Sequence, residues 1–242
     1  MISAQATLVN DLRKRFTRVR QLIDDRARGC GRLPTEVTLV AVTKTHPVET
    51  LRLALSLGMK DLGENRIQEA EVKIEEVGRE AAHWHLIGHL QANKIRRAVK
   101  LFDLMHSVDS MAVAQKLDRS CVEEGRTILP VLIQVDLAGE ATKSGIAANE
   151  LEELAETIVL SERLQLQGLM TVPPFFAKPE EVRPFFKRLR ELRDTLQSRG
   201  CFAERAGDLS MGMSHDFEIA IEEGATIVRI GTALFGEREL TR

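Results

Sequence analysis

The chain has 242 residues, of which 43% are hydrophobic and 29% charged, and its formal net charge is −2. This length can bury a sizeable core without disulfides or metals, and the composition is that of a soluble globular protein. The near-neutral charge argues against a nucleic-acid binder that relies on bulk positive charge, and no apolar run is long enough to span a membrane.

The first predicted element is a helix at the N-terminus, over residues 3–28, where apolar residues recur at helical spacing. The helix is rich in arginine and lysine, a feature that could suit RNA or a membrane surface. Because aspartates balance much of this charge, we interpret the basic residues as a solvated face. We therefore expect residues 1–28 to pack on the rest of the chain, with no nucleic-acid and no membrane partner.

Beyond this helix, short apolar runs typical of strands alternate with helical patterns. Eight such alternations predict an α/β protein with a parallel sheet, and their number and length fit a single (β/α)8 TIM-type barrel domain over residues 1–242. A doubly wound open sheet is the alternative that periodicity leaves open. The predicted strands are 38–43, 59–62, 84–87, 104–107, 129–135, 166–170, 208–210 and 226–230, and the predicted helices are 48–57, 67–77, 111–124, 151–160, 180–198 and 216–223.

Glycine and serine residues mark several helix ends in this pattern. Glycines 58, 125, 200 and 224 follow predicted helices within two residues, as C-terminal stops do. Ser214 precedes the last predicted helix and suits an N-cap.

Lys44 is the first candidate functional residue, because it ends a predicted strand in the stretch "LVAVTK". A charged lysine at the end of a buried strand must be solvated or paired, and its usual interpretation is solvation. Barrel sites form at the carboxyl ends of the strands, and a lysine enclosed there beside another cation has a lowered pKa. The neutral amine can then attack an aldehyde to form a Schiff base.

Two loops further along the chain are candidates for binding phosphate. In many barrels of this class phosphate binds after strands seven and eight, at the start of a short helix. Here strand seven runs into Ser210 and the sequence "MGMS", and strand eight runs into Gly231 and Thr232. Both loops offer hydroxyl and amide donors and a glycine that allows close approach. These residues are also common in ordinary turns.

Arg229 lies inside the last predicted strand, on the same face as Ile227. Because arginine stays protonated, a buried arginine must find partners. One interpretation is a salt bridge to a carboxylate on a neighbouring strand, and the other is a donor directed at a ligand. A lysine, a phosphate site and this arginine together point to pyridoxal phosphate, whose pyridine nitrogen can be partnered by arginine.

Two further residue types are candidates for other chemistry. His83 and His85 share a strand face and could ligate a metal, but with no third ligand nearby in sequence they are interpreted as core or rim histidines, and no metal is expected. The three cysteines, Cys30, Cys121 and Cys201, are widely spaced, which indicates reduced thiols and a cytoplasmic location.

Several of these stretches together resemble the pyridoxal phosphate homeostasis protein family. Its members are single-domain relatives of the alanine racemase barrel, that is, of fold type III pyridoxal phosphate proteins without their second β-domain. The matching stretches span residues 39–236 and read "LVAVTK", "DLGENRIQEA", "WHLIGHLQANK", "GLMTVPP" and "LSMGMSHDFEIAIEEGATIVRIGTALFG".

The resemblance implies a role for each site residue. Lys44 carries the Schiff base, Asn65 lies beside the cofactor and Arg229 faces the pyridine nitrogen. The phosphate is held by Ser210, Gly231 and Thr232, and the pocket is lined by His85 and Met170.

The family resembles a cofactor carrier that keeps free pyridoxal phosphate in balance, so we expect no catalytic residue and no strong turnover. Barrel racemases of this cofactor use a lysine and a tyrosine as opposed bases, whereas this chain has no tyrosine. A weak amino-acid racemase or decarboxylase is the first alternative. A second is a cofactor-free class I aldolase in which Lys44 is assisted by Glu64. Apo enzymes that need the cofactor are the expected acceptors, and the chain is expected to be a monomer.

Overall fold

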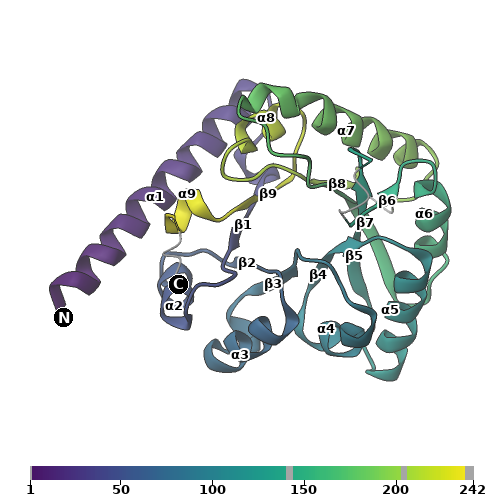
Figure 1. Cartoon of the computed structure of the whole chain (residues 1–242), viewed down its shortest axis with the longest axis horizontal. Coiled ribbons are helices and arrows are strands. Elements are labelled where there is room, and N and C mark those ends of the chain that lie inside the picture. Colours follow the sequence, from purple (N-terminus) through teal and green to yellow (C-terminus); the bar gives the residue numbers. More distant parts are fainter. Residues whose placement is uncertain (1, 140–143, 203–205, 238–242) are drawn as a thin grey trace.

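The computed structural model describes residues 2–139, 144–202 and 206–237, which form a closed barrel of eight parallel strands surrounded by helices (Figure 1). The strands lie around the barrel in the order β1, β2, β3, β4, β5, β7, β8, β9, and β9 pairs with β1 to close it. The predicted barrel is confirmed and the open-sheet alternative is wrong. The strands are β1 Thr38–Val42, β2 Asp61–Glu64, β3 His83–Leu86, β4 Leu104–Val108, β5 Leu129–Asp136, β7 Leu164–Met170, β8 Asp208–Ser210 and β9 Ile227–Ile230, and a short β6, Ile146–Ala147, pairs with the end of β5.

Helices cover the outside of the barrel, and the long N-terminal helix packs beside it against α8 and α9 (Figure 1). Among the helices of the described ranges, none has both the length and the apolar character needed to cross a bilayer. The helices are α1 Ile2–Gly29, α2 Val48–Ser56, α3 Ile67–Val77, α4 Ile95–Leu101, α5 Met111–Glu123, α6 Leu151–Val159, α7 Arg183–Ser198, α8 Phe217–Glu222 and α9 Thr232–Phe235, with 3-10 turns at Pro34–Glu36, Arg79–Ala81, Ala92–Lys94 and Pro179–Val182.

Three details differ from the sequence prediction. Strand β2 begins at Asp61 rather than at residue 59, because the amide of Met59 still donates to the carbonyl of Ala54 and closes helix α2. Helix α4 was not predicted, because its apolar positions are too few to give a sustained period. Ser214 is not an N-cap: Asp216 occupies that position before α8.

Side chains alternate along the strands between two packing layers. On β1, Leu39 and Ala41 belong to the large core between the strands and the helices, whereas Val40 belongs to a small cluster inside the barrel. On β9, Val228 packs outward and Ile227 inward in the same way. This alternation decides which polar residues reach the barrel interior. The inner cluster consists of Val40, Leu104, Leu132, Met170 and Ile227.

Candidate functional site

Lys44 lies in a turn directly after β1, at the carboxyl end of the barrel, and its side chain is partly buried. The next residue, Thr45, has a φ of 65°. A β-branched residue rarely adopts this left-handed conformation, and such strain persists only where the surroundings hold it. The backbone around Lys44 is therefore held in place by other parts of the protein.

Helix α3 supplies the groups that hold this turn. The Nζ atom of Lys73 donates to the carbonyl of Thr43 and to one carboxylate oxygen each of Glu64 and Glu69, all at 2.7 Å. The same Glu69 oxygen accepts the amide of Thr45. The residues on both sides of Lys44 are thus tied to the buried ammonium group of Lys73, which is 4% exposed. We call Lys73, Glu64 and Glu69 the α3 clamp.

Glu64 faces the helix layer and not the barrel interior. It shares the outward face of β2 with Leu62, and its Oε1 atom accepts the hydroxyl of Thr43 at 2.6 Å. Burial raises its pKa, against the opposing charge and hydrogen bond of Lys73. The carboxylate is committed to the α3 clamp, so the structure gives no support to Glu64 as the acid of a Lys44 aldolase.

Asn65 follows β2 and lies against Gly88, which follows β3. A Cβ atom on Gly88 would lie only 2.4 Å from the Asn65 carbonyl oxygen, so glycine is needed for this close approach. Asn65 also lines a cavity of about 710 Å³ together with Arg66, His89 and Lys94. Asn65 is thereby placed at the open end of the barrel.

Arg229 points into the barrel, two residues beyond Ile227, and is only 4% exposed. Its Nη2 atom donates to the carbonyl of Thr171 at 2.8 Å, and its Nη1 atom donates to the hydroxyl of Ser210. Burial lowers its pKa to about 10, although the charge of Asp216 opposes this. Within the described residues it forms no ion pair within 4 Å, so the expected alternative of a salt bridge to a neighbouring strand is not observed.

Ser210 ends β8 and lies next to Met170 in the strand register. Its hydroxyl contacts Arg229 and the Nδ1 atom of His106, at 2.9 Å from the latter. These contacts place Ser210 beside Arg229, deep in the barrel. Met170 is fully buried in the inner cluster.

His106 on β4 was missed by the sequence analysis. Its Nε2 atom lies 2.9 Å from Nδ1 of His85, and the His85 Nε2 atom lies 3.2 Å from the carboxylate of Asp61. Burial lowers the pKa of His106 well below its usual value, and the charges of His85 and Arg229 add to this. A polar residue at an inward position of an otherwise buried strand, "LMHSV", is the signal that could have identified it.

Gly231 is the N-cap of the short helix α9, which begins at Thr232, and it lies next to β1, the strand that precedes Lys44. A Cβ atom on Gly231 would lie 3.5 Å from the Cβ atom of Val42. The hydroxyl of Ser214, in the loop after β8, accepts the amides of Gly231 and Ala233 at 3.2 and 3.1 Å. The two loops predicted to bind phosphate therefore meet, and Ser214 is a residue of this junction that the sequence analysis interpreted only as a helix cap.

The structure also describes the two histidines considered as metal ligands and the three cysteines. His83 and His85 lie on one face, and both approach the same oxygen of Asp61, at 3.5 and 3.2 Å. The described residues contain no group of three or more histidine, cysteine, aspartate or glutamate side chains that could hold a metal. Cys30, Cys121 and Cys201 are free thiols.

The donor set of this barrel end suits a ligand with three different functional groups. An amine on a held turn suits an aldehyde, a buried guanidinium suits a ring nitrogen, and a glycine loop with hydroxyls suits a phosphate. The arginine is the most selective of these features, because it is a buried cation whose described partners are a hydroxyl and a carbonyl, with no described carboxylate within 4 Å. The residues present fit pyridoxal phosphate.

Comparisons with known proteins agree with this interpretation. Residues 23–239 match the family model described as alanine racemase, N-terminal domain. A pyridoxal phosphate homeostasis protein of Aquifex aeolicus is 42% identical over 226 residues, which cover 93% of this chain and 98% of that protein.

Two solved structures extend the comparison. PipY of Synechococcus elongatus, solved with pyridoxal phosphate bound, is 36% identical with a TM-score of 0.81, over 93% of this chain and all of that one. Alanine racemase of Corynebacterium glutamicum shares the fold at 16% identity, with a TM-score of 0.70 over 96% of this chain and 62% of that one.

Proposed function

The chain belongs to the pyridoxal phosphate homeostasis protein family, and from this premise we propose that it binds pyridoxal 5'-phosphate at the carboxyl end of its barrel. The observation that carries the proposal is the pairing of two features. One is the strained, clamped turn that presents Lys44, and the other is the buried Arg229, which has no carboxylate within ion-pair distance among the described residues.

Each predicted site residue has a role in this proposal. The cofactor would supply an aldehyde, and Lys44 would hold it as a Schiff base, its amine nitrogen replacing the aldehyde oxygen, which leaves as water. Arg229 directs a donor at the pyridine nitrogen, and Asn65 lies beside the ring. Gly231, Thr232 and Ser210 are the predicted phosphate residues. The hydroxyl of Ser210 is already bound to Arg229 and His106, so we add Ser214, whose hydroxyl orders the amides of the loop at Gly231. His85 and Met170 line the base of the pocket.

The proposed activity is to hold and release the cofactor rather than to turn over a substrate. A donor at the pyridine nitrogen disfavours protonation of the ring and so weakens its capacity to accept electrons. The chain also has no tyrosine to act as a second base opposite Lys44. A weak racemase or decarboxylase activity is the competing proposal.

The proposed acceptors of the cofactor are apo enzymes that depend on it, in the cytoplasm. Residues 1–242 are proposed to act as one barrel domain. Release to an acceptor requires that the cofactor remain reachable, and the large cavity beside Asn65 opens the same end of the barrel.

The proposal is tested by titrating the purified chain with pyridoxal phosphate and recording its visible absorbance, followed by a panel of amino acids as substrates. We expect saturable binding by wild type, its loss in Lys44→Ala, and no turnover above the free cofactor. A robust turnover of any amino acid that vanishes in Lys44→Ala would favour the enzyme instead.

A further inference from the structure

A chain of hydrogen-bonded side chains runs through the barrel interior and ends at Arg229. It begins at Asp61, the first residue of β2, and continues through His85 on β3 and His106 on β4 to Ser210 on β8. The successive contacts measure 3.2, 2.9 and 2.9 Å, and Arg229 donates to the same Ser210 hydroxyl. Every member except Asp61 is less than 6% exposed. We call these five residues the barrel relay.

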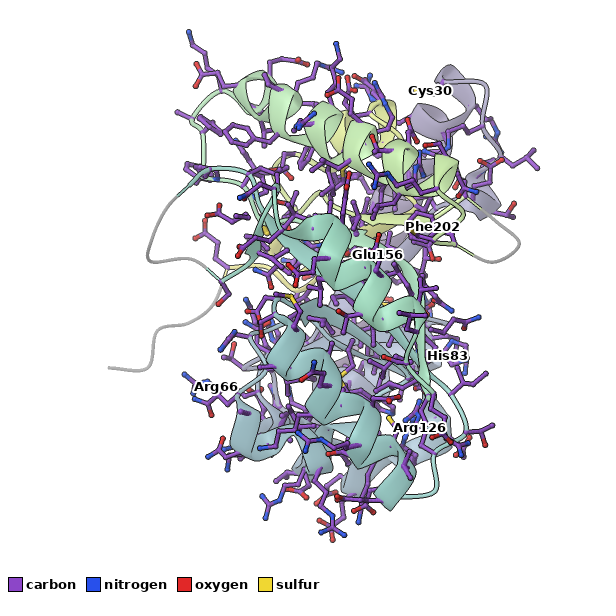
Figure 2. The ribbon with its side chains drawn as sticks, turned by 90° about the vertical axis from the view of Figure 1, so that its right-hand side faces the viewer. Cys30, Arg66, His83, Arg126, Glu156 and Phe202 are labelled. Atoms are coloured by element: carbon purple, nitrogen blue, oxygen red, sulfur yellow. The ribbon has the colours of Figure 1, made fainter. Side chains whose placement is uncertain are left out.

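The relay joins two different ends of the molecule. Asp61 is 27% exposed, and it also approaches His83 at the amino end of the barrel. Figure 2 shows His83 at the opposite side of the molecule from Arg66, which follows β2 at the carboxyl end. Asp61 is therefore far from the mouth of the barrel, although it is connected to Arg229 in the barrel interior.

The two ends of the relay have fixed hydrogen-bonding roles. Arginine can only donate, so Ser210 accepts from Arg229. Burial raises the pKa of Asp61, but the hydrogen bond and charge of His85 and the charge of His83 outweigh this and leave it lowered. Asp61 is thus an ionised carboxylate, which can only accept.

With a neutral His85, these two ends determine every proton between them. The His85 Nε2 atom must carry a proton for Asp61, which leaves its Nδ1 atom as an acceptor. His106 must then donate from Nε2, so its Nδ1 atom accepts the hydroxyl proton of Ser210. His106 stays neutral, because burial and the neighbouring charges lower its pKa.

We propose that Asp61 acts as a positioning residue, which fixes through His85 and His106 the direction in which the Ser210 hydroxyl donates. The Ser210 proton points to His106, so its oxygen turns a lone pair to Arg229. The arginine is then held by two acceptors, Ser210 and the carbonyl of Thr171. That this orientation of Arg229 serves the cofactor rests on the proposed function, but the hydrogen-bond pattern of the relay does not.

One added proton would reverse the relay. If His85 gains a second proton, its Nδ1 atom donates to Nε2 of His106, and His106 must move its own proton to Nδ1. Ser210 then accepts hydrogen bonds from both His106 and Arg229. Its own hydroxyl no longer donates to His106. The titratable and charged groups around His85 are Asp61 from β2, His83 on β3 itself and His106 from β4, with Arg229 from β9 acting on His106.

The test is nuclear magnetic resonance of the ring nitrogens of histidine in the ¹⁵N-labelled chain without cofactor, which distinguishes protonated from unprotonated nitrogens. Where His85 carries a single ring proton, we expect that proton and the one on His106 both to lie on Nε2. Where His85 carries two ring protons, we expect His106 to be neutral with its proton on Nδ1. A merely structural packing role would not produce this coupled shift.

Two variants sharpen the test. In Asp61→Asn the side chain offers a donor as well as an acceptor, so the Nδ1-protonated form should appear at both histidines together. The matched control is His83→Gln, which removes the other histidine at the same carboxylate and should leave both patterns unchanged. The proposal is overturned if wild-type His106 is protonated on Nδ1 while His85 carries one ring proton, or if it keeps its Nε2 proton while His85 carries two. Failure to bind pyridoxal phosphate would refute the proposed function but would not change the conclusion on the protonation of His85 and His106.

Discussion

Burial of the charged Arg229 side chain is unfavourable, and the groups around it indicate its role. A guanidinium removed from water needs acceptors, and the described part of the chain gives it a hydroxyl and a carbonyl rather than a carboxylate within 4 Å. A carboxylate would neutralise the arginine and compete with a ligand for its donors. The chosen partners orient the cation and leave its charge available.

We expect Arg229→Gln to weaken retention of pyridoxal phosphate by about 10- to 100-fold, the equivalent of losing a charged hydrogen bond. The visible spectrum of the bound cofactor should shift as well. Equilibrium dialysis and absorbance measure the two effects, and circular dichroism should show the fold intact. Arg188→Gln, at an exposed arginine of α7, is the control. Unchanged affinity and spectrum would refute the role of Arg229.

The positions of two residues could be predicted because each contradicts its local pattern. Lys44 lies after β1 at the carboxyl end of the barrel and Arg229 lies inside the last strand, as expected, while their roles toward the cofactor stay predictions. Lys73, His106 and Ser214 were missed as site residues, because their significance depends on partners 30, 104 and 17 positions away in sequence. A helical lysine or a serine in a turn has nothing unusual in its own neighbourhood.

At the scale of elements, helix α3 determines the geometry of the β1 turn. The buried ammonium group of Lys73, on α3, donates three hydrogen bonds. One of its acceptors is Glu64, which is fully buried. Removing one partner of a buried ion pair leaves the other charge uncompensated.

We expect Lys73→Met to lower the free energy of unfolding by about 3–5 kcal/mol, because Glu64 would remain buried without its cation. Urea denaturation measures this. The double variant Lys73→Met with Glu64→Gln should recover part of the loss, and Lys187→Met, at an exposed lysine of α7, should change little. If Lys73→Met were as stable as wild type, the α3 clamp would make no net contribution to the free energy of unfolding.

Asp103 connects two other elements, because its carboxylate binds Arg79 and accepts the amide of Trp84 at 2.8 Å. Burial raises its pKa, but these hydrogen bonds outweigh burial and leave the pKa lowered. A lowered pKa means that the carboxylate stabilises the fold above its unfolded pKa of about 4. That contribution is lost as the pH falls through the folded value.

Asp103→Asn should therefore be less stable than wild type at pH 7, and the difference should shrink as the pH falls below about 4. Urea unfolding at a series of pH values measures the difference. Asp194→Asn is the control, because its partner is the adjacent Arg193 on an exposed surface. A difference that stays constant with pH would contradict the assignment.

At the scale of the whole molecule, the fold was predictable because each strand is a compact apolar run between helix signals. Eight such units in order fit a closed barrel, although they left an open sheet as the alternative, and the strand bounds differ by at most two residues at either end from those predicted. What sequence could not give is the set of contacts across the barrel. The relay and the α3 clamp each join residues from three or more elements, and only closure of the barrel brings them together.

Closure also bears on association. The closed sheet leaves no long edge strand in the described chain, and the large exposed apolar side chains are spread over separate helices and loops. We therefore propose a monomer of 27.1 kDa. Light scattering during size-exclusion chromatography measures the mass, and a stable dimer at micromolar concentration would contradict the proposal.

The central claim is that Lys44 anchors the cofactor, and the most direct test is chemical trapping. Wild type and Lys44→Ala are each incubated with pyridoxal phosphate, reduced with borohydride and digested, and the modified lysine is identified by mass spectrometry. We predict that wild type carries the reduced adduct on Lys44, and that Lys44→Ala neither shows the visible absorbance band nor retains a stoichiometric adduct. A stoichiometric adduct on another lysine, or one that survives in Lys44→Ala, would contradict this account.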